Sequence, residues 1–290
     1  MRRFIDELLL SEGITMTGAI ALSDCIIGRR YLLKREGIED GTCIVFAIPY
    51  LSREADTAKR NVSAYAVPYD YHQFVCELGK RIIPALYKKF PSNKFALFAD
   101  HSPIDERDAA VKCGIGSFGD NHLIMNTKYS SFFFIGELIT DAVLASDPPS
   151  GEVCIHCGVC KSKCPMTIDG CECFSAITQK KGELSDLEEN LIKRYKCAWG
   201  CDVCQDVCPI TVAARKSGSV YTDIPFFKEG ITPTLTSEIV RSMDDDEFPR
   251  RAYSWRGREV ILRNLALLEE EKEADEEKKG KLIPSEERQE

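Results

Sequence analysis

The residues with the clearest chemistry in this chain are cysteines spaced for metal binding. The first run reads Cys-x2-Cys-x2-Cys-x3-Cys-Pro and contains Cys154, Cys157, Cys160 and Cys164. In bacterial ferredoxins, three cysteines of such a run bind one 4Fe–4S cluster and the fourth binds a second cluster. Tight turns bring the first three thiolates to one cubane, and the following Pro165 turns the chain away. The run therefore predicts iron–sulfur chemistry.

A second run reads Cys-x2-Cys-x3-Cys-Pro and contains Cys201, Cys204 and Cys208. It lacks its first cysteine, whose place is taken by Ala198, so that a ligand must come from elsewhere. Cys173 and Cys197 are the candidates. Exchanging the last cysteine of each run, as ferredoxins do, gives a first cluster bound by Cys154, Cys157, Cys160 and Cys208. A second cluster would take Cys164, Cys201, Cys204 and one of the two candidates.

Two zinc sites are the alternative, because Cys-x2-Cys pairs also suit zinc. The two Cys-Pro endings and the ferredoxin spacing favour iron–sulfur clusters. A disulfide framework is disfavoured because the N-terminus is wrong for a signal peptide: acidic residues surround its short apolar patch. The remaining cysteines in apolar settings are expected to be buried structural thiols: Cys25, Cys43, Cys76 and Cys113.

Bulk composition describes a globular chain with no affinity for membranes. It has 290 residues, 44% of them hydrophobic, and no apolar run reaches the ~20 residues that a membrane span needs. The net charge of −8 gives no general attraction to nucleic acid, which leaves a local basic face as the alternative. We expect a soluble cytoplasmic protein whose first helix ends near Gly13.

Residues 1–150 read as alternating strands and helices, which predicts an α/β or α+β sandwich around a central sheet. An amphipathic helix is expected over Asp70–Phe90. The expected strands are Ile14–Leu22, Thr42–Ile48, Lys94–Phe98, His122–Met125 and Ser131–Leu138.

The glycine-rich stretch 114–119 matches the letters of a dinucleotide fingerprint. Because it precedes an expected strand rather than a helix, we do not interpret it as a dinucleotide loop.

Residues 151–220 are expected to form a ferredoxin-like domain. This part of the chain holds ten of the fourteen cysteines but little hydrophobic pattern, so metal clusters would have to stabilise it. Residues 221–290 are expected to contain a helix at Arg256–Leu268, followed by a charged tail over Glu269–Glu290.

Several segments, in this order and spacing, match one known family. They are Tyr65-Ala66, Asp70-Tyr71-His72, Ala99-Asp100-His101-Ser102-Pro103, Glu106-Arg107, Gly114-Ile115-Gly116, 131–138, Asp141, the first cysteine run, Cys173, Gly200–Gln205, Gly257 and Leu262-Arg263-Asn264. On these segments the chain resembles the epoxyqueuosine reductases, cobalamin-dependent iron–sulfur enzymes distantly related to reductive dehalogenases.

The resemblance implies a cobalamin-binding α/β domain joined to a ferredoxin-like domain with two clusters. Such enzymes reduce an epoxide on a modified tRNA base to an alkene, with electrons from a donor of the flavodoxin or ferredoxin type. The acid that protonates the leaving oxygen would be Asp100, in Asp-x-x-Pro. A turn or helix-cap role is the alternative for this residue. The fourth ligand of the second cluster would be Cys173.

The family binds the corrin mainly through backbone groups, without a histidine below the cobalt. The matching cofactor-binding positions are Asp100, Ser63, Asn121, Ile124 and Ile135. The letters Asp70-x-His72 also resemble the start of a motif in cobalamin proteins that do use a lower histidine. That motif needs glycine where this chain has Val75, so we interpret the segment as a polar helix start.

The chain departs from the family in places that bear on its substrate. Ser117 and Asp120 replace a tryptophan and a lysine of the glycine-rich segment, Tyr69 replaces an arginine, and Ile210 replaces a tryptophan. The chain matches a short form that lacks C-terminal helical repeats. These departures weaken the prediction that tRNA is the substrate more than they weaken the prediction of the iron–sulfur clusters and cobalamin. The alternative is therefore a ferredoxin-like electron carrier, or a protein that reduces another protein's corrinoid.

Overall fold

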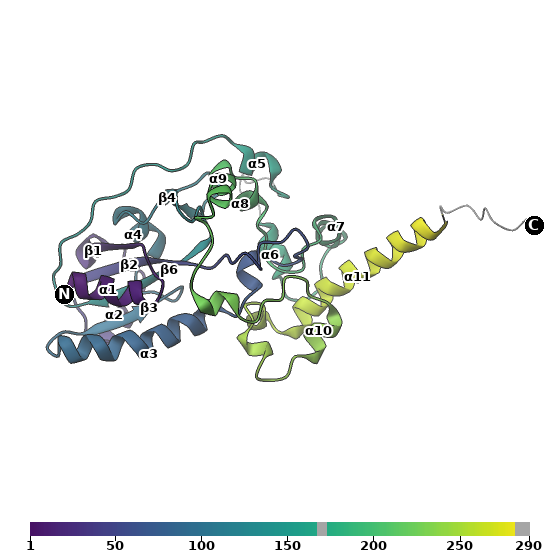
Figure 1. Ribbon diagram of the computed structural model, residues 1–290. Coiled ribbons are helices and arrows are strands. Elements are labelled where there is room, and N and C mark those ends of the chain that lie inside the picture. Colours follow the sequence, from purple (N-terminus) through teal and green to yellow (C-terminus); the bar gives the residue numbers. More distant parts are fainter. Residues whose placement is uncertain (167–172, 282–290) are drawn as a thin grey trace, which may run out of the picture.

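A four-stranded antiparallel sheet organises the first half of the chain (Figure 1). The computed structural model describes residues 1–166 and 173–281, with side chains up to residue 271. The strands follow the order β1-β2-β6-β3 and comprise β1 (Thr17–Ala21), β2 (Thr42–Pro49), β6 (Phe133–Thr140) and β3 (Phe95–Phe98). A separate hairpin pairs β4 (Ser117–Phe118) with β5 (Ile124–Met125). The glycine-rich stretch 114–119 thus contains β4 and precedes β5, the shorter form of the predicted strand His122–Met125, and opens no helix.

The register of the two central strands depends on one glycine. Phe46 of β2 lies opposite Gly136 of β6. A β-carbon at Gly136 would lie 2.4 Å from the Phe46 ring, so only glycine leaves room for this fully buried aromatic side chain. β2 is buried along its whole length. A central strand covered on both faces reads as a continuous apolar run, which is why its position was evident from the sequence.

Helices cover both faces of the sheet. Helices α1 (Arg2–Ser11) and α3 (Tyr71–Lys89) pack on one face, and α2 (Arg30–Arg35) and α4 (Glu106–Lys112) pack on the other. Alternate residues of β2 divide between these two layers because side chains of a strand point to opposite faces. The predicted sandwich with a central sheet is therefore present, and all of its strand pairs are antiparallel.

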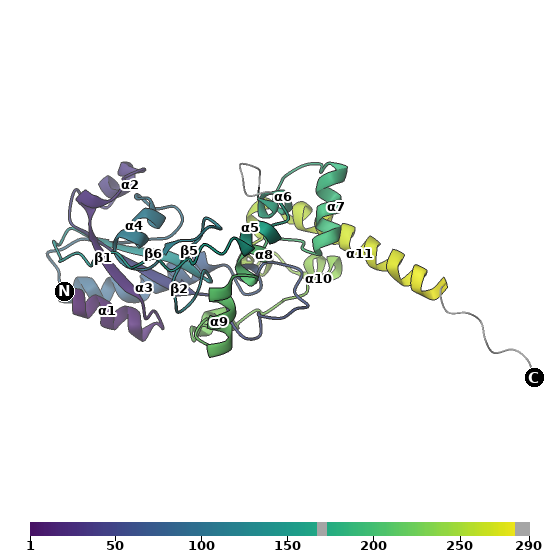
Figure 2. The ribbon, with the colours of Figure 1, turned by 90° about the horizontal axis from the view of Figure 1, so that it is seen from above.

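The second half of the described chain is helical. Its helices are α5 (Val159–Lys163), α6 (Phe174–Thr178), α7 (Asp186–Tyr195), α8 (Val203–Asp206), α9 (Pro209–Ser217), α10 (Ser237–Ser242) and α11 (Arg258–Lys281). Short 3-10 turns lie at Leu22–Asp24, Ala64–Ala66, Pro225–Lys228, Phe248–Arg250 and Ser254–Arg256. Helix α11 includes most of the predicted helix 256–268 and continues into the acidic segment (Figure 2). Residues 282–290 of the predicted tail lie outside the described residues.

Each half of the chain contributes residues to the hydrophobic core of the other half. Val62 and Val67 pack in the helical core around Trp199 and Tyr253. In return, the segment after α9 places Phe227 in the core of the sheet. The predicted domain boundaries 1–150, 151–220 and 221–290 stay a prediction. Within the described residues, no helix has the length and apolarity needed to cross a membrane.

Candidate active site between the sheet and the cysteine helices

The first predicted group of thiols converges on one small cavity. Its lining includes Cys154, Cys157, Cys160 and Cys208. The first two belong to the loop before α5, the third lies in α5, and the last lies directly before α9. Gly158 (φ 71°) and His156 (φ 50°) have left-handed backbone conformations that tighten this loop. The structure therefore brings together four residues that sequence spacing assigned to one cluster.

The second predicted group lies beside a larger cavity. Cys173, Cys201 and Cys204 line it together. Burial raises the pKa of Cys204 to about 12, and the nearby thiols of Cys173 and Cys164 add to this rise. The competing candidate, Cys197, donates its thiol hydrogen to the carbonyl oxygens of Trp199 and Gly200, at 3.5 and 3.3 Å. Cys173 thus lines the larger cavity with Cys201 and Cys204, whereas Cys197 lines another cavity with Cys201, and the choice of the fourth ligand stays a prediction.

One prediction about the remaining cysteines is wrong. Cys25, Cys43 and Cys113 are buried as expected, but Cys76 is exposed. Its neighbours Phe74 and Val75 face the sheet from helix α3. The helical turn therefore directs Cys76 to the outer face of α3, although its sequence setting is apolar.

The larger cavity, of about 890 Å³, lies between the end of the sheet and helices α6 and α8. Its walls are aromatic, hydroxyl, amide and basic side chains together with the three thiols. Lining residues beyond the cysteines include Tyr50, Ser63, Tyr65, Asn121, Ser131, Phe133, Phe134, Lys180, Lys181, Gln205 and Arg256. Asn121 also lines the smaller cysteine cavity. The two groups of cysteines are thus close to the same space.

A second cavity of about 170 Å³ shares part of this lining, including Ser131, Phe133 and Phe134. Ile124 and Ile135 line it. The four predicted corrin-binding positions other than Asp100 consequently surround two neighbouring cavities. The mixture of flat aromatic walls, apolar side chains and amide or hydroxyl groups suits a large planar cofactor with polar substituents.

A buried carboxylate, next to Cys201 at the start of α8, fixes this helix and its Cys204 against the first half of the chain. Asp202 accepts hydrogen bonds from the Ser63 hydroxyl (2.5 Å), the Ala64 amide (2.6 Å) and the Gln205 side chain (3.0 Å). Arg60 also contacts it at 3.3 Å. Burial raises the pKa of Asp202, and Arg60 opposes this rise. Sequence reasoning placed Asp202 and Gln205 only in a shared segment and assigned them no role.

Asp100 follows β3 in an exposed loop, with a left-handed backbone conformation (φ 60°). Its amide donates to Glu106 Oε2 at 3.2 Å, and its Oδ2 lies 3.7 Å from His72 Nε2. Asp100 lines neither cavity, but Glu106 lines the 170 Å³ cavity together with Tyr71. The structure therefore connects the predicted acid to the site through Glu106.

Known proteins share both the sequence and the fold of this chain. An epoxyqueuosine reductase of Leadbetterella byssophila is 31% identical over 231 residues, which are 76% of this chain and 74% of that protein. The chain belongs to the epoxyqueuosine reductase family. The predicted family and oxidoreductase class are thereby confirmed. No family model matches the chain.

Other family members match over shorter stretches. The Escherichia coli epoxyqueuosine reductase is 37% identical over 160 residues, covering 51% of this chain and 41% of that protein. A crystal structure of an epoxyqueuosine reductase with an epoxyqueuosine-modified tRNA-Tyr stem loop has a TM-score of 0.71 at 22% identity. It covers 92% of this chain, and this chain covers 81% of it. The Streptococcus thermophilus enzyme gives a TM-score of 0.70 at 20% identity, covering 98% and 86% of the two chains. These structures show a shared fold.

Two of the four predicted departures from the family, Ser117 and Asp120, contact the first cysteine run or the residue before it. Asp120 Oδ1 lies 2.8 Å from His156 Nδ1, and Glu152 Oε1 lies 2.7 Å from the other ring nitrogen. The hydroxyl of Ser117 accepts a hydrogen bond from the Val153 amide at 2.9 Å. The anion at position 120 is therefore paired with an imidazole. Both substitutions hold the β4–β5 hairpin against the cysteine loop.

A glutamate of β6 is buried without compensation. Both oxygens of Glu137 lack a hydrogen-bond partner among the described residues, although Ser102 is nearby. Burial raises the pKa of Glu137 well above 4.5, and Glu106 adds to the rise. Above about pH 4.5 the unfolded chain releases the proton of this carboxyl group, whereas the folded protein keeps it. The free energy of unfolding therefore decreases as the pH rises from about 4.5 towards the raised pKa.

Glu137→Gln should consequently become more stabilising as pH rises. The gain relative to the natural protein should grow by about 1.4 kcal/mol per pH unit above pH 4.5, up to the raised pKa, because glutamine needs no proton to fold. Thermal unfolding of both proteins, purified anaerobically, between pH 5 and 8 measures the difference. A stability difference that is constant across this range would contradict a neutral buried Glu137.

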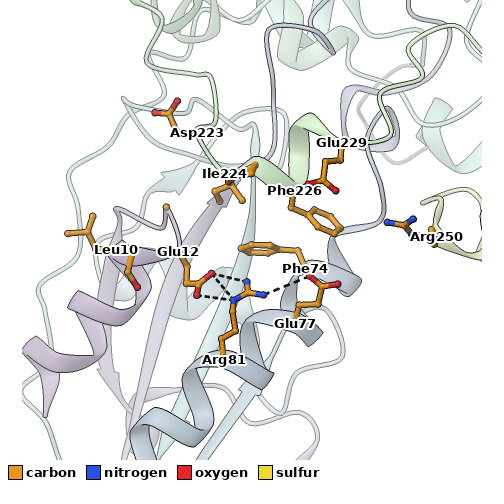
Figure 3. Close-up of a pocket in the computed structure, with 13 residues that line it drawn as sticks. Leu10, Glu12, Phe74, Glu77, Arg81, Asp223, Ile224, Phe226, Glu229 and Arg250 are labelled. Carbon is orange, nitrogen blue, oxygen red and sulfur yellow. Dashed lines mark hydrogen bonds and ion pairs between the residues drawn. The ribbon is translucent and has the colours of Figure 1, made fainter.

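A further pocket of about 530 Å³ lies apart from the cysteines, between α1, α3 and the 223–229 segment (Figure 3). Arg81 projects into it but is already paired with Glu12 at 2.8 Å and Glu77 at 3.8 Å. No residue predicted for the cofactors or the catalytic acid lines this pocket. The cavities beside the cysteines are therefore the candidate site.

Proposed function

We propose that this chain is a cobalamin-dependent iron–sulfur reductase. Its substrate is epoxyqueuosine in tRNA or a related electrophilic epoxide, which it reduces to an alkene. The observation that carries this proposal is the 890 Å³ cavity, whose lining combines cysteines of the second predicted cluster with two predicted corrin positions, Ser63 and Asn121. A reducing centre and a substrate would thereby share one space.

The proposed ligands of the first 4Fe–4S cluster are Cys154, Cys157, Cys160 and Cys208. The second cluster takes Cys164, Cys173, Cys201 and Cys204. When bound, such clusters supply electrons one at a time at low potential. Asn121, which lines both cysteine cavities, lies between them on the proposed route to the substrate. The external donor is proposed to be a flavodoxin or a ferredoxin.

Cobalamin is proposed to lie in the two neighbouring cavities, held by Ser63, Asn121, Ile124 and Ile135. When bound, it supplies a low-valent cobalt that delivers the electrons to the epoxide. The Ser63 hydroxyl donates to Asp202, its amide donates to the Trp199 carbonyl and its carbonyl accepts from the Ala66 amide, so that Ser63 would form a fixed part of the wall beside the cofactor. The aromatic side chains of Phe133 and Phe134 give both cavities an apolar wall on which the corrin would rest.

The proposed catalytic acid is Asp100. As the C–O bond of the epoxide breaks, negative charge develops on oxygen, and a nearby carboxyl group lowers the barrier by donating a proton. Glu106 holds the Asp100 amide and thereby sets the direction of the loop. The same glutamate lines the 170 Å³ cavity, which connects the loop to the substrate space.

Basic side chains at the larger cavity support tRNA as the substrate. Lys181 and Arg256 line it, together with Lys180, which is paired with Glu188 at 2.8 Å, although the chain carries a net charge of −8. Trp255, beside Arg256, is 58% exposed and offers a surface for stacking of an unpaired base. We propose that the anticodon region of a tRNA approaches this face. The proposed compartment is the cytoplasm, where thiols stay reduced.

The decisive experiment is a titration of the anaerobically purified protein with cob(II)alamin, followed by EPR. Iron and sulfide analysis first confirms the clusters. A cobalt signal that shifts to the base-off form at stoichiometric protein is expected, followed by reduction of epoxyqueuosine in tRNA when a low-potential reductant is added. If the clusters are intact but cobalt stays base-on and unbound, the proposed reductase is excluded, and an electron carrier becomes the better assignment.

A further inference from the structure

The proposed reaction needs two protons, and the proposed catalytic acid supplies one of them. Reduction of an epoxide to an alkene consumes two electrons and two protons, and the epoxide oxygen leaves as water. The first C–O bond breaks and its oxygen takes one proton to become a hydroxyl. The second C–O bond then breaks, and the hydroxide that leaves takes the second proton. The electrons come from the low-potential donor, whereas a single carboxyl group such as that of Asp100 can donate only one proton at a time. A second proton must therefore reach the same place within one turnover.

A histidine lies between two aspartates at this place. His72, at the start of α3, has its Nδ1 2.7 Å from Asp70 Oδ1 and its Nε2 3.7 Å from Asp100 Oδ2. Asp70 also accepts the His72 amide at 2.8 Å, so both the ring and the backbone of the histidine are held. A polar helix start accounts for the amide contact. It does not account for an imidazole that reaches from the helix cap to the loop of the proposed acid.

We propose that His72 is a positioning and proton-supplying partner of Asp100. After Asp100 has protonated the epoxide oxygen, its carboxylate takes the proton of His72 Nε2, and the imidazole regains a proton from solvent. His72 is half exposed, so solvent reaches it. The 3.7 Å separation is longer than a hydrogen bond, and such contacts often tighten when substrate binds. The inference rests on the proposed function, since it needs Asp100 as the acid.

Charges around His72 set the direction of its pH dependence. Asp70 faces the ring from the helix start and Asp100 faces it from the loop after β3, while Glu106 lies behind Asp100. The hydrogen bond to Asp70 is the main cause that raises the pKa of His72, and Asp100 adds to it. The imidazolium form therefore persists to higher pH than in a free histidine. Turnover should fall as pH rises through this pKa, because the second proton is then missing.

The test compares two substitutions of His72 with a neighbouring control. His72→Gln should lower kcat by about 10- to 100-fold and remove the alkaline fall of the pH profile, with base-off cobalt binding unchanged. His72→Ala should regain part of its activity with added imidazole. The control, His101→Gln, lies next to Asp100 in sequence, but its ring faces the Tyr31 hydroxyl at 3.0 Å, so activity and pH profile should be retained. An unchanged pH profile in His72→Gln together with no rescue by imidazole would overturn the inference.

A second readout is independent of turnover. The chain has four histidines, so NMR of the protein with 13C-labelled histidine can follow each ring during a pH titration. Asp100→Asn should lower the pKa of His72, because Asp100 is one of the groups that raise it. If the pKa of His72 does not change, the two groups are not coupled and the inference fails. If the natural protein binds no cobalamin and reduces no epoxide, the proposed function fails, and this titration still decides whether His72 and Asp100 act as a pair.

Discussion

Asp100→Asn is expected to lower turnover by about 10²- to 10⁴-fold, the range in which a positioned acid contributes to catalysis. Asparagine has the same size and keeps the amide that donates to Glu106, so the loop should retain its conformation. It also tolerates the left-handed backbone that Asp100 adopts. Only the transferable proton is removed. Turnover of epoxyqueuosine tRNA by the anaerobic protein, together with iron analysis and cobalt EPR, measures this effect.

Asp105→Asn provides the matched control for this substitution. Asp105 lies in the same loop, but its carboxylate caps α4 by accepting the amides of Arg107 and Asp108, both at 3.1 Å. Asparagine caps helices about as well as aspartate, so activity should be retained. Unchanged turnover in Asp100→Asn would remove Asp100 from its proposed role, and the acid would then have to be sought at Glu106 or solvent.

Cys173→Ser is expected to abolish turnover by removing the second cluster. Iron should fall from about eight to about four atoms per chain, because each 4Fe–4S cluster needs its four thiolates. Serine is a much poorer ligand for iron–sulfur clusters. Without this cluster, electrons cannot reach the cavity that Cys173, Cys201 and Cys204 line. Iron and sulfide content and the EPR spectrum of the reduced protein provide the measurement.

Cys197→Ser separates the two candidates for the fourth thiol. The Cys197 thiol points at backbone carbonyl oxygens, where a serine hydroxyl can also donate. This variant should therefore keep about eight iron atoms and its activity. The reverse result, with a cluster lost from Cys197→Ser and kept in Cys173→Ser, would show that the bound cluster rearranges this loop and that Cys197 is the ligand.

Local spacing in the sequence determined much of the site. The ferredoxin spacing identified Cys154, Cys157 and Cys160 as one group. Thiols two residues apart on tight turns point towards the same place, and all three line one cavity. The continuous apolar run of β2 and the helical period of α3 located the main layers of the first half. Such patterns arise within a few residues of each other, so each can be recognised without knowing how the chain folds.

Tertiary structure decided what depends on residues far apart in the chain. It exposed Cys76, buried Glu137, and placed Cys173 rather than Cys197 in the lining of the larger cavity. It also paired the unusual Asp120 with His156, 36 residues later. The contact of His72 with Asp100 joins the start of a helix to the loop after a strand. No local period encodes such contacts, because they form only when the packing of helices on the sheet brings separate segments together.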